Sequence, residues 1–82
     1  MKTIKRFTAS WCAPCKGLAM IIDSINTEVP IEVIDIDDNM DLARENQVRS
    51  VPTLIMFEDG KEIKRSTGVM TENQLLDWIN NG

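Results

Sequence analysis

Apolar residues recur along this 82-residue chain with two different spacings, and each spacing predicts one kind of element. After Cys12 they recur every three or four residues, which is the repeat of an amphipathic helix ending near Asn26 or Thr27. Pro30 then prevents any continuation of that helix. The residues that this spacing turns toward the core are Leu18, Ile21, Ile22 and Ile25.

Four other segments are predicted to be strands. The second of them is dominated by β-branched residues, so we expect a parallel central strand that is buried on more than one side. The pair Asp59-Gly60 is a type I′ hairpin signal between the last two strands. The final strand has four charged residues around Ile63 and therefore belongs at a sheet edge. The predicted strands are Lys2–Thr8, Ile31–Ile36, Thr53–Phe57 and Lys61–Ser66.

A short helix is predicted between the second and third strands. Asp38 or Asn39 caps its start, and it runs to about Glu45 with Leu42 and Ala43 on its inner side. Four carboxylates gather here, but they do not follow the spacing of a calcium loop, so we interpret them as capping and solvated residues. They are Asp35, Asp37, Asp38 and Asp41.

The closing helix begins at a capping box from Thr71 to Gln74, and its residues Leu75, Leu76 and Ile79 face inward. The order strand, helix, strand, helix, strand, strand, helix predicts an α/β fold with a mixed four-stranded sheet and three helices on its two faces. A chain of 82 residues with 43% hydrophobic residues has room for one core only. Residues 1–82 are therefore predicted to form a single domain.

The only two cysteines, Cys12 and Cys15, are separated by two residues at a predicted strand-to-helix junction. Backbone N–H groups and the helix dipole at such a tip favour a thiolate on Cys12, and Lys16 adds a nearby positive charge. Cys15 lies about one turn further on the same side, within reach of a disulfide. Pro14 fits the first turn, where its missing N–H removes no helical hydrogen bond. The pair therefore predicts a redox site that can close and open.

Other uses of such a pair need residues that this chain lacks. A zinc site needs four ligands, and with no His and no third Cys a zinc ion could only be shared between molecules. Haem attachment needs a His after the second cysteine, where Lys16 stands. We therefore expect no metal and no bound cofactor, only the redox-active disulfide of Cys12 and Cys15.

The charge and hydropathy of the chain narrow the range of partners. Nine basic residues against 13 acidic ones give a net charge of −4, which argues against nucleic acid as a partner. No apolar segment of a secretory signal follows the basic start. The longest apolar run, Leu18–Ile22, is five residues, against about 20 for a membrane helix. We expect a cytoplasmic monomer that binds neither nucleic acid nor membranes.

The residues Phe7–Lys16, FTASWCAPCK, followed by Val51–Thr53 and Gly68, resemble the thioredoxin family, and the likeness covers nearly the whole chain. The resemblance implies a thioredoxin fold and a protein disulfide reductase that works by dithiol–disulfide exchange. In the implied mechanism Cys12 attacks a substrate disulfide, and Cys15 then attacks the mixed disulfide and frees the reduced substrate.

The resemblance also implies roles in substrate binding. The Val51–Pro52 bond would be cis and placed against the cysteines, with the Val51 backbone pairing to an extended substrate. The alternative is a plain proline at the start of a strand. Gly68 would let a substrate backbone approach. Trp11 either contacts the substrate or covers the cysteines as an apolar side chain.

The chain departs from the family pattern in four ways. The strand and helix that normally precede the motif strand are absent, so the length approaches that of a glutaredoxin. Ala13 replaces the customary glycine, which should alter the redox potential, and Val33 replaces an expected lysine. Arg6 stands where the family has a buried carboxylate that helps to deprotonate the second cysteine, so the proton acceptor of Cys15 is missing or relocated. We expect Arg6 to reach solvent from a less covered sheet face and to lower the pKa of Cys12.

The predicted function is a small thioredoxin that reduces disulfides in client proteins such as ribonucleotide reductase. The resemblance implies regeneration by a flavin- and NADPH-dependent reductase. One alternative is a glutaredoxin-like reductase regenerated by glutathione, although Trp11 before the motif and Ala13-Pro14 inside it differ from that pattern. The other alternative is a redox-silent binding subunit with incidental cysteines.

Overall fold

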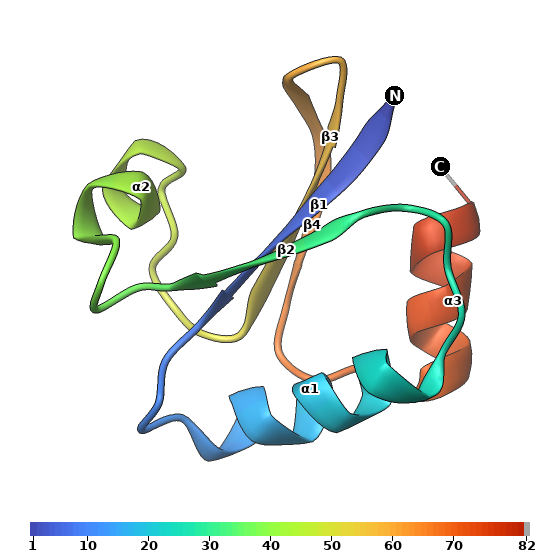
Figure 1. The fold of residues 1–82 in the computed structure, drawn as a ribbon, viewed down its shortest axis with the longest axis horizontal. Coiled ribbons are helices and arrows are strands. Elements are labelled where there is room, and N and C mark those ends of the chain that lie inside the picture. Colours follow the sequence, from blue (N-terminus) through green and yellow to red (C-terminus); the bar gives the residue numbers. More distant parts are fainter. Residues whose placement is uncertain (82) are drawn as a thin grey trace.

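The computed structural model describes residues 1–81. Within this range the elements follow the predicted order, and the sheet has the strand order β2-β1-β3-β4 (Figure 1). β1 pairs in parallel with β2 and antiparallel with β3, and β3 pairs antiparallel with β4, so the predicted mixed sheet is confirmed. The elements are β1 (Lys2–Thr8), α1 (Ala13–Ser24), β2 (Ile31–Asp35), α2 (Met40–Glu45), β3 (Thr53–Glu58), β4 (Lys61–Thr67) and α3 (Glu72–Asn80).

The two faces of the sheet have separate apolar clusters, each covered by different helices (Figure 1). On one face Leu18 of α1 and Leu75 of α3 pack against the strands. On the other face Phe7 and Ile34 are buried next to Leu42 of α2. Alternate residues of a strand point to opposite faces, so β1 and β3 contribute to both clusters. The predicted arrangement of helices on both faces is confirmed.

The hairpin between β3 and β4 forms at the predicted pair. Asp59 and Gly60 both have positive φ, 53° and 86°, as a type I′ turn requires. β4 lies at the sheet edge, as its charged residues predicted. Lys64 on this strand donates hydrogen bonds to the backbone carbonyls of Trp78 and Asn81. A cation at these carbonyls stabilises the C-terminal end of α3.

The capping box at the start of α3 is formed as predicted. The Thr71 hydroxyl accepts a hydrogen bond from the Gln74 N–H at 3.1 Å, and the Gln74 side chain accepts one from the Thr71 N–H at 2.9 Å. We expect Thr71→Ala to lower the free energy of unfolding by about 1 kcal/mol, because the Gln74 N–H loses its partner. Urea denaturation measures the loss, and Thr71→Ser is the control that keeps the hydroxyl. Equal losses in the two variants would contradict the prediction.

The prediction that the second strand is central and buried is wrong. Within residues 1–81, β2 is an edge strand that pairs only with β1, and Val33 is 56% exposed. Ile34 is buried, whereas Glu32 is exposed like Val33. β-branched residues favour an extended backbone wherever the strand lies, so their abundance does not distinguish an edge strand from a central one.

Two helix ends also differ from the prediction. α1 ends at Ser24, two or three residues early, because Ile25 is extended with φ −101° and ψ 158°. Ile25 still packs against the core, so the apolar repeat continues past the helix itself. Asn39 is the N-cap residue of α2, but its side chain donates to the Asp35 carbonyl at 3.0 Å and caps no N–H of the helix.

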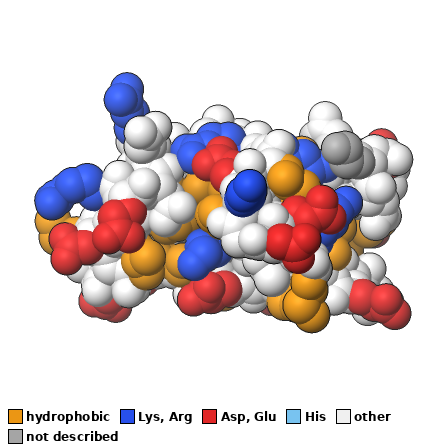
Figure 2. Space-filling model, turned by 90° about the horizontal axis from the view of Figure 1, so that it is seen from above, with side chains coloured by type: hydrophobic (Ala, Val, Ile, Leu, Met, Phe, Trp, Pro, Cys, Tyr) orange, Lys and Arg blue, Asp and Glu red, His pale blue; other side chains and the backbone are white. Residues whose placement is uncertain are grey.

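Acidic and basic side chains are interspersed on the face of the molecule seen in Figure 2. The part of this face that the structure describes therefore has no continuous positive surface of the kind that binds nucleic-acid phosphates. Separately, no helix within residues 1–81 has the length and apolar character needed to cross a membrane.

Candidate active site

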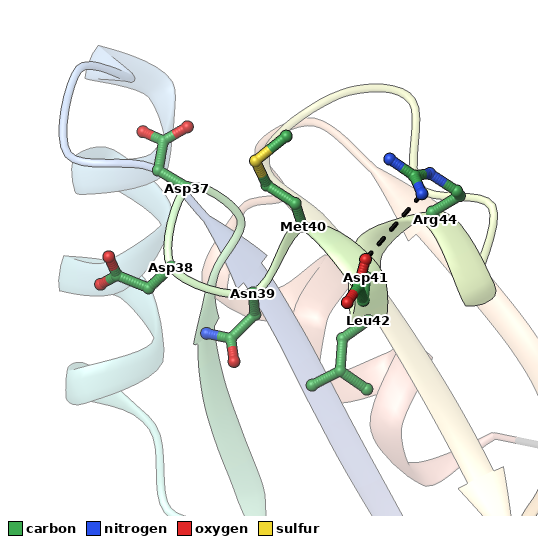
Figure 3. A pocket seen from close by; sticks show the side chains of 7 residues that line it. All are labelled: Asp37, Asp38, Asn39, Met40, Asp41, Leu42 and Arg44. Atoms are coloured by element: carbon green, nitrogen blue, oxygen red, sulfur yellow. Dashed lines mark ion pairs between the residues drawn. The ribbon is translucent and has the colours of Figure 1, made fainter.

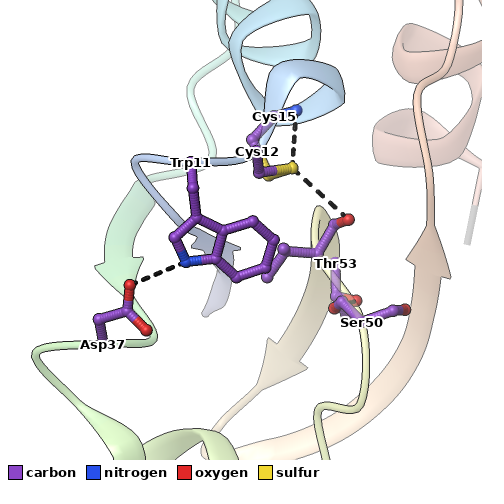
Figure 4. Close-up of a disulfide and its surroundings, with 7 residues drawn as sticks. Trp11, Cys12, Cys15, Asp37, Ser50 and Thr53 are labelled. Carbon is purple, nitrogen blue, oxygen red and sulfur yellow. Dashed lines mark hydrogen bonds between the residues drawn. A yellow bond between two sulfur atoms is a disulfide. The ribbon is translucent and has the colours of Figure 1, made fainter.

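Cys12 and Cys15 lie at the start of α1 and form a disulfide, with their Cα atoms 5.3 Å apart (Figure 4). Cys12 is the N-cap residue of the helix, and the backbone N–H of Cys15 donates to its Sγ at 3.2 Å. Pro14 lies in the first turn, where the sequence places it. The two sulfurs are therefore held at a helix tip, within bonding reach of each other.

The tip of α1 favours negative charge on the Cys12 sulfur. The first N–H groups of the helix have no intrahelical partner, and the helix dipole is positive at this end. The first turn contains no acidic residue that would oppose this charge, and Lys16 is exposed in the same turn. In the reduced protein, the hydrogen bond from the Cys15 N–H becomes charge-assisted when Cys12 is a thiolate.

Both cysteines are almost fully buried. Cys12 is 4% exposed and Cys15 is 1% exposed, and they pack with Ala9, Ile36 and Val51. Cys12 therefore reaches the surface only over a small area, at the rim of the site. A client disulfide has to fit closely against this rim to reach Cys12.

The loop before β3 forms one wall of this rim. The Val51–Pro52 peptide bond is cis, as the family resemblance implied. The Val51 carbonyl oxygen lies 3.7 Å from Cys12 Sγ, and Pro52 is buried. The Thr53 hydroxyl donates to the Ser50 carbonyl at 2.7 Å across the loop. Within residues 1–81 the Val51 N–H makes no hydrogen bond, so it is free to pair with another strand.

Gly68 follows β4 and contacts the same loop. Its N–H donates to the Pro52 carbonyl at 2.9 Å, and its φ of 85° lies in the left-handed region that favours glycine. A Cβ atom built at this position would meet nothing within 4 Å. The backbone conformation therefore accounts for glycine here, and the space in front of it is open.

Trp11 lies beside the disulfide with 66% of its surface exposed. Its indole Nε1–H donates to Asp37 Oδ2 at 2.9 Å, which fixes the ring against the loop after β2 (Figure 4). Contact with the substrate and apolar cover of the cysteines both stay predictions for this exposed ring. The partner residue Asp37 was missed by sequence reasoning, because we assigned the carboxylates of this segment to capping and solvation.

Asp38 and Asp41 are exposed, as expected for solvated carboxylates. Figure 3 shows Asp37, Asp38 and Asp41 pointing in different directions, and Asp41 pairs with Arg44 at 3.9 Å. No three or more His, Cys, Asp or Glu side chains within residues 1–81 are grouped so that they could hold a metal ion.

The expectation that Arg6 lies on a less covered sheet face is wrong, but its side chain is only half-buried and lines an open cleft. Arg6 shares a face of β1 with Ile4, beneath α1, and lines the same cleft as Ala19 of that helix. In the described chain its Nε atom is buried without a hydrogen-bond partner. Burial lowers the pKa of the Arg6 guanidinium from its ordinary value, and the Asp23 carboxylate on α1 opposes the shift. Arginine remains protonated in proteins, so a positive charge lies beneath the helix.

Two thiols that close into a disulfide at a helix tip give this site one chemistry, the exchange of disulfides, because one thiolate can attack and the other can release the intermediate. The fold and the site together define the class of thiol–disulfide oxidoreductases.

Comparison with known proteins agrees with that class. The family model described as Thioredoxin matches residues 2–81. A thioredoxin of Rickettsia felis is 41% identical over 78 residues, covering 90% of this chain and 74% of that protein. A thioredoxin of Chlamydia trachomatis is 41% identical over 76 residues, covering 89% and 74%. The solved structure of a mutant thioredoxin from Halobacterium salinarum gives a TM-score of 0.88 at 35% identity, covering 95% and 71%. The chain belongs to the thioredoxin family, and it is a protein disulfide reductase.

Proposed function

We propose that Cys12 is the nucleophile of this reductase and that Cys15 is the resolving thiol. The Cys12 thiolate attacks one sulfur of a client disulfide, forms a mixed disulfide and displaces a client thiolate. The Cys15 thiolate then attacks Cys12 Sγ, the bond from Cys12 to the client breaks, and the Cys12–Cys15 disulfide forms. Two electrons and two protons pass to the client. The observation that carries this assignment is the bonded sulfur pair at the tip of α1.

The rim residues hold the client in this proposal. The free Val51 N–H pairs with an extended client segment as an added strand, and Pro52 keeps the loop against Cys12. The open space before Gly68 admits the client backbone. The exposed ring of Trp11 supplies apolar contact beside the sulfur.

Four residues tune the thiolate in this proposal. Lys16 and Arg6 are positive charges near the pair and favour the ionised sulfur. Ala13 and Pro14 set the geometry of the first turn between the cysteines, and hence the balance between dithiol and disulfide.

Family membership implies disulfide-containing client proteins and a reductase as general partners. We further propose that an NADPH- and flavin-dependent thioredoxin reductase regenerates this chain and that ribonucleotide reductase is one client. Residues 1–82 then act as a single domain and as a monomer in the cytoplasm, with no cofactor beyond the disulfide and no nucleic acid or membrane as partner. The 41% identity to bacterial thioredoxins and the net charge of −4 support these assignments.

Insulin reduction tests the proposed function. The protein is supplied with dithiothreitol, with NADPH and a thioredoxin reductase, or with glutathione and glutathione reductase. We expect turnover with dithiothreitol and with thioredoxin reductase but not with glutathione, and no turnover by Cys12→Ser. Turnover with glutathione alone would favour the glutaredoxin-like alternative. A Cys12→Ser variant as active as the wild type would overturn the exchange mechanism and leave a binding subunit.

A further inference from the structure

The resolving step requires the almost fully buried thiol of Cys15 to lose its proton. Cys15 is 1% exposed, and only its thiolate can attack the mixed disulfide. Burial among apolar groups disfavours the charged form, so ionisation of Cys15 needs an acceptor and a route for its proton. The packed neighbours Ala9, Ile36 and Val51 offer neither on their side of the pair.

One opening does reach Cys15. A cleft of about 250 Å³ lies between the start of α1 and the ends of β1 and β2, and Cys15 is part of its lining. Because one water takes about 30 Å³ of liquid volume, this space holds several water molecules. The remaining lining residues are Thr8, Ala9, Ser10 and Ala19, together with the charged residues Arg6, Lys16 and Asp35.

Among the three charged residues of this lining, only Asp35 can accept a proton. The side chains of Arg6 and Lys16 are hydrogen-bond donors without an acceptor atom. Asp35 is the last residue of β2 and pairs in register with Thr8, which lies on the α1 side of β1 with Arg6. Asp37 bonds to Trp11, and neither it nor Asp23 belongs to the lining of this cleft.

The Asp35 carboxylate is also held in place. Its Oδ1 accepts a hydrogen bond from the Asp37 N–H at 2.8 Å, an Asx-type turn that orients the group and leaves Oδ2 available to water. In the described part of the chain it forms no ion pair, although Arg6 and Lys16 line the same cleft. We propose that Asp35 accepts the proton of Cys15 through water in this cleft.

The step is balanced as follows. The Cys15 thiol gives its proton to a water, which passes a proton to Asp35 Oδ2, and the Cys15 thiolate attacks Cys12 Sγ. The Cys15–Cys12 bond forms while the bond from Cys12 to the client sulfur breaks. The client leaves as a thiolate and takes up the proton from Asp35 through the same water. Arg6 and Lys16 stabilise the transient Cys15 thiolate as nearby cations.

The sign of the effect separates this role from a purely electrostatic one. The carboxylate is a negative charge near Cys15, so its removal would by itself favour the thiolate and speed the resolving step. If Asp35 accepts the proton, its removal has the opposite effect and slows that step. A positioned general base contributes about 10²–10⁴ in rate, and water alone remains as a weaker acceptor, so we expect Asp35→Asn to slow resolution at least about tenfold at pH 7.

Stopped-flow reaction of the reduced protein with 5,5′-dithiobis(2-nitrobenzoate) measures the two steps separately. Attack by Cys12 releases one thionitrobenzoate, and attack by Cys15 on the mixed disulfide releases the second. We expect Asp35→Asn to slow the second release relative to the first, and the deficit to shrink as the pH rises because hydroxide then removes the proton. Asp38→Asn, an exposed carboxylate outside the cleft, is the matched control and should behave as wild type.

The role of Asp35 rests on the exchange mechanism proposed above. The first thionitrobenzoate release tests the exchange mechanism, and the second release tests the role of Asp35. Absence of the first release in the wild type would overturn the exchange mechanism itself. A second release that is unchanged or faster in Asp35→Asn, or slowed equally at all pH values, would overturn the role of Asp35 alone. Circular dichroism of the variant verifies that it is folded, and recovery of the second phase in Asp35→Glu would support a proton acceptor.

Discussion

Replacing Cys15 by serine is expected to stop turnover and to trap the protein as a mixed disulfide with its client. Cys12 keeps its position at the tip of α1, so the first attack still occurs, but no second sulfur is present to release the client. Residues that act as a unit lose most of the rate when one is removed, so turnover should fall by at least about a thousandfold. Non-reducing electrophoresis and mass spectrometry of the adduct measure the trapped species.

The matched control is Cys12→Ser, in which the buried thiol of Cys15 remains and the N-cap sulfur is lost. We expect an equal loss of turnover but no trapped adduct. Adducts of similar yield in both variants would contradict the assignment of nucleophile and resolving thiol.

Phe7→Ala is expected to lower the free energy of unfolding far more than Thr71→Ala. The ring is 0% exposed and packs with Ile34 and Ile55 in the cluster beneath α2. Truncating a buried phenylalanine to alanine costs about 3–5 kcal/mol, because the lost apolar burial is added to the cavity that remains. Whole domains are stable by only about 5–15 kcal/mol, so the variant should be unfolded or nearly so at 37 °C.

Urea denaturation followed by circular dichroism measures this loss. Phe7→Leu is the matched control, because leucine keeps much of the apolar volume and leaves a smaller cavity, so its loss of stability should be smaller. If Phe7→Ala lost no more stability than Phe7→Leu, the cluster beneath α2 would not be the continuous core described above.

Features that depend on neighbouring residues could be predicted from the sequence. The capping box at Thr71, the Asp59-Gly60 turn and the cysteine pair at a helix start each involve residues within a few positions of one another. Their geometry follows from local hydrogen bonds and backbone preferences, so it does not depend on the rest of the fold. The edge position of β4 was also predicted correctly, because charged side chains are typical of an edge strand.

Features that depend on distant residues could not be predicted from the residues themselves, and the position of Val51 and Pro52 against Cys12 was expected only from the family resemblance. The edge position of β2 depends on which strands pair with each other. β-branched residues are common in central and in edge strands, so the composition of β2 does not reveal its place in the sheet. The hydrogen bond from Trp11 to Asp37 joins residues 26 positions apart. Arg6 lies on the face of β1 that α1 covers, and the residues around Arg6 do not determine which face a later helix covers. The cleft at Cys15 is lined by residues from β1, α1 and β2, so it could not be predicted from the sequence.

The most direct single measurement is the pKa of the Cys12 thiol in the reduced Cys15→Ser variant, where only one thiol titrates. Thiolate absorbance followed against pH gives this value. We predict a pKa clearly below the roughly 8.5 of free cysteine, because the tip of α1, Lys16 and Arg6 all favour the thiolate. Arg6→Gln in the same background should raise it. A pKa at or above about 8.5 would contradict an activated sulfur at this helix tip.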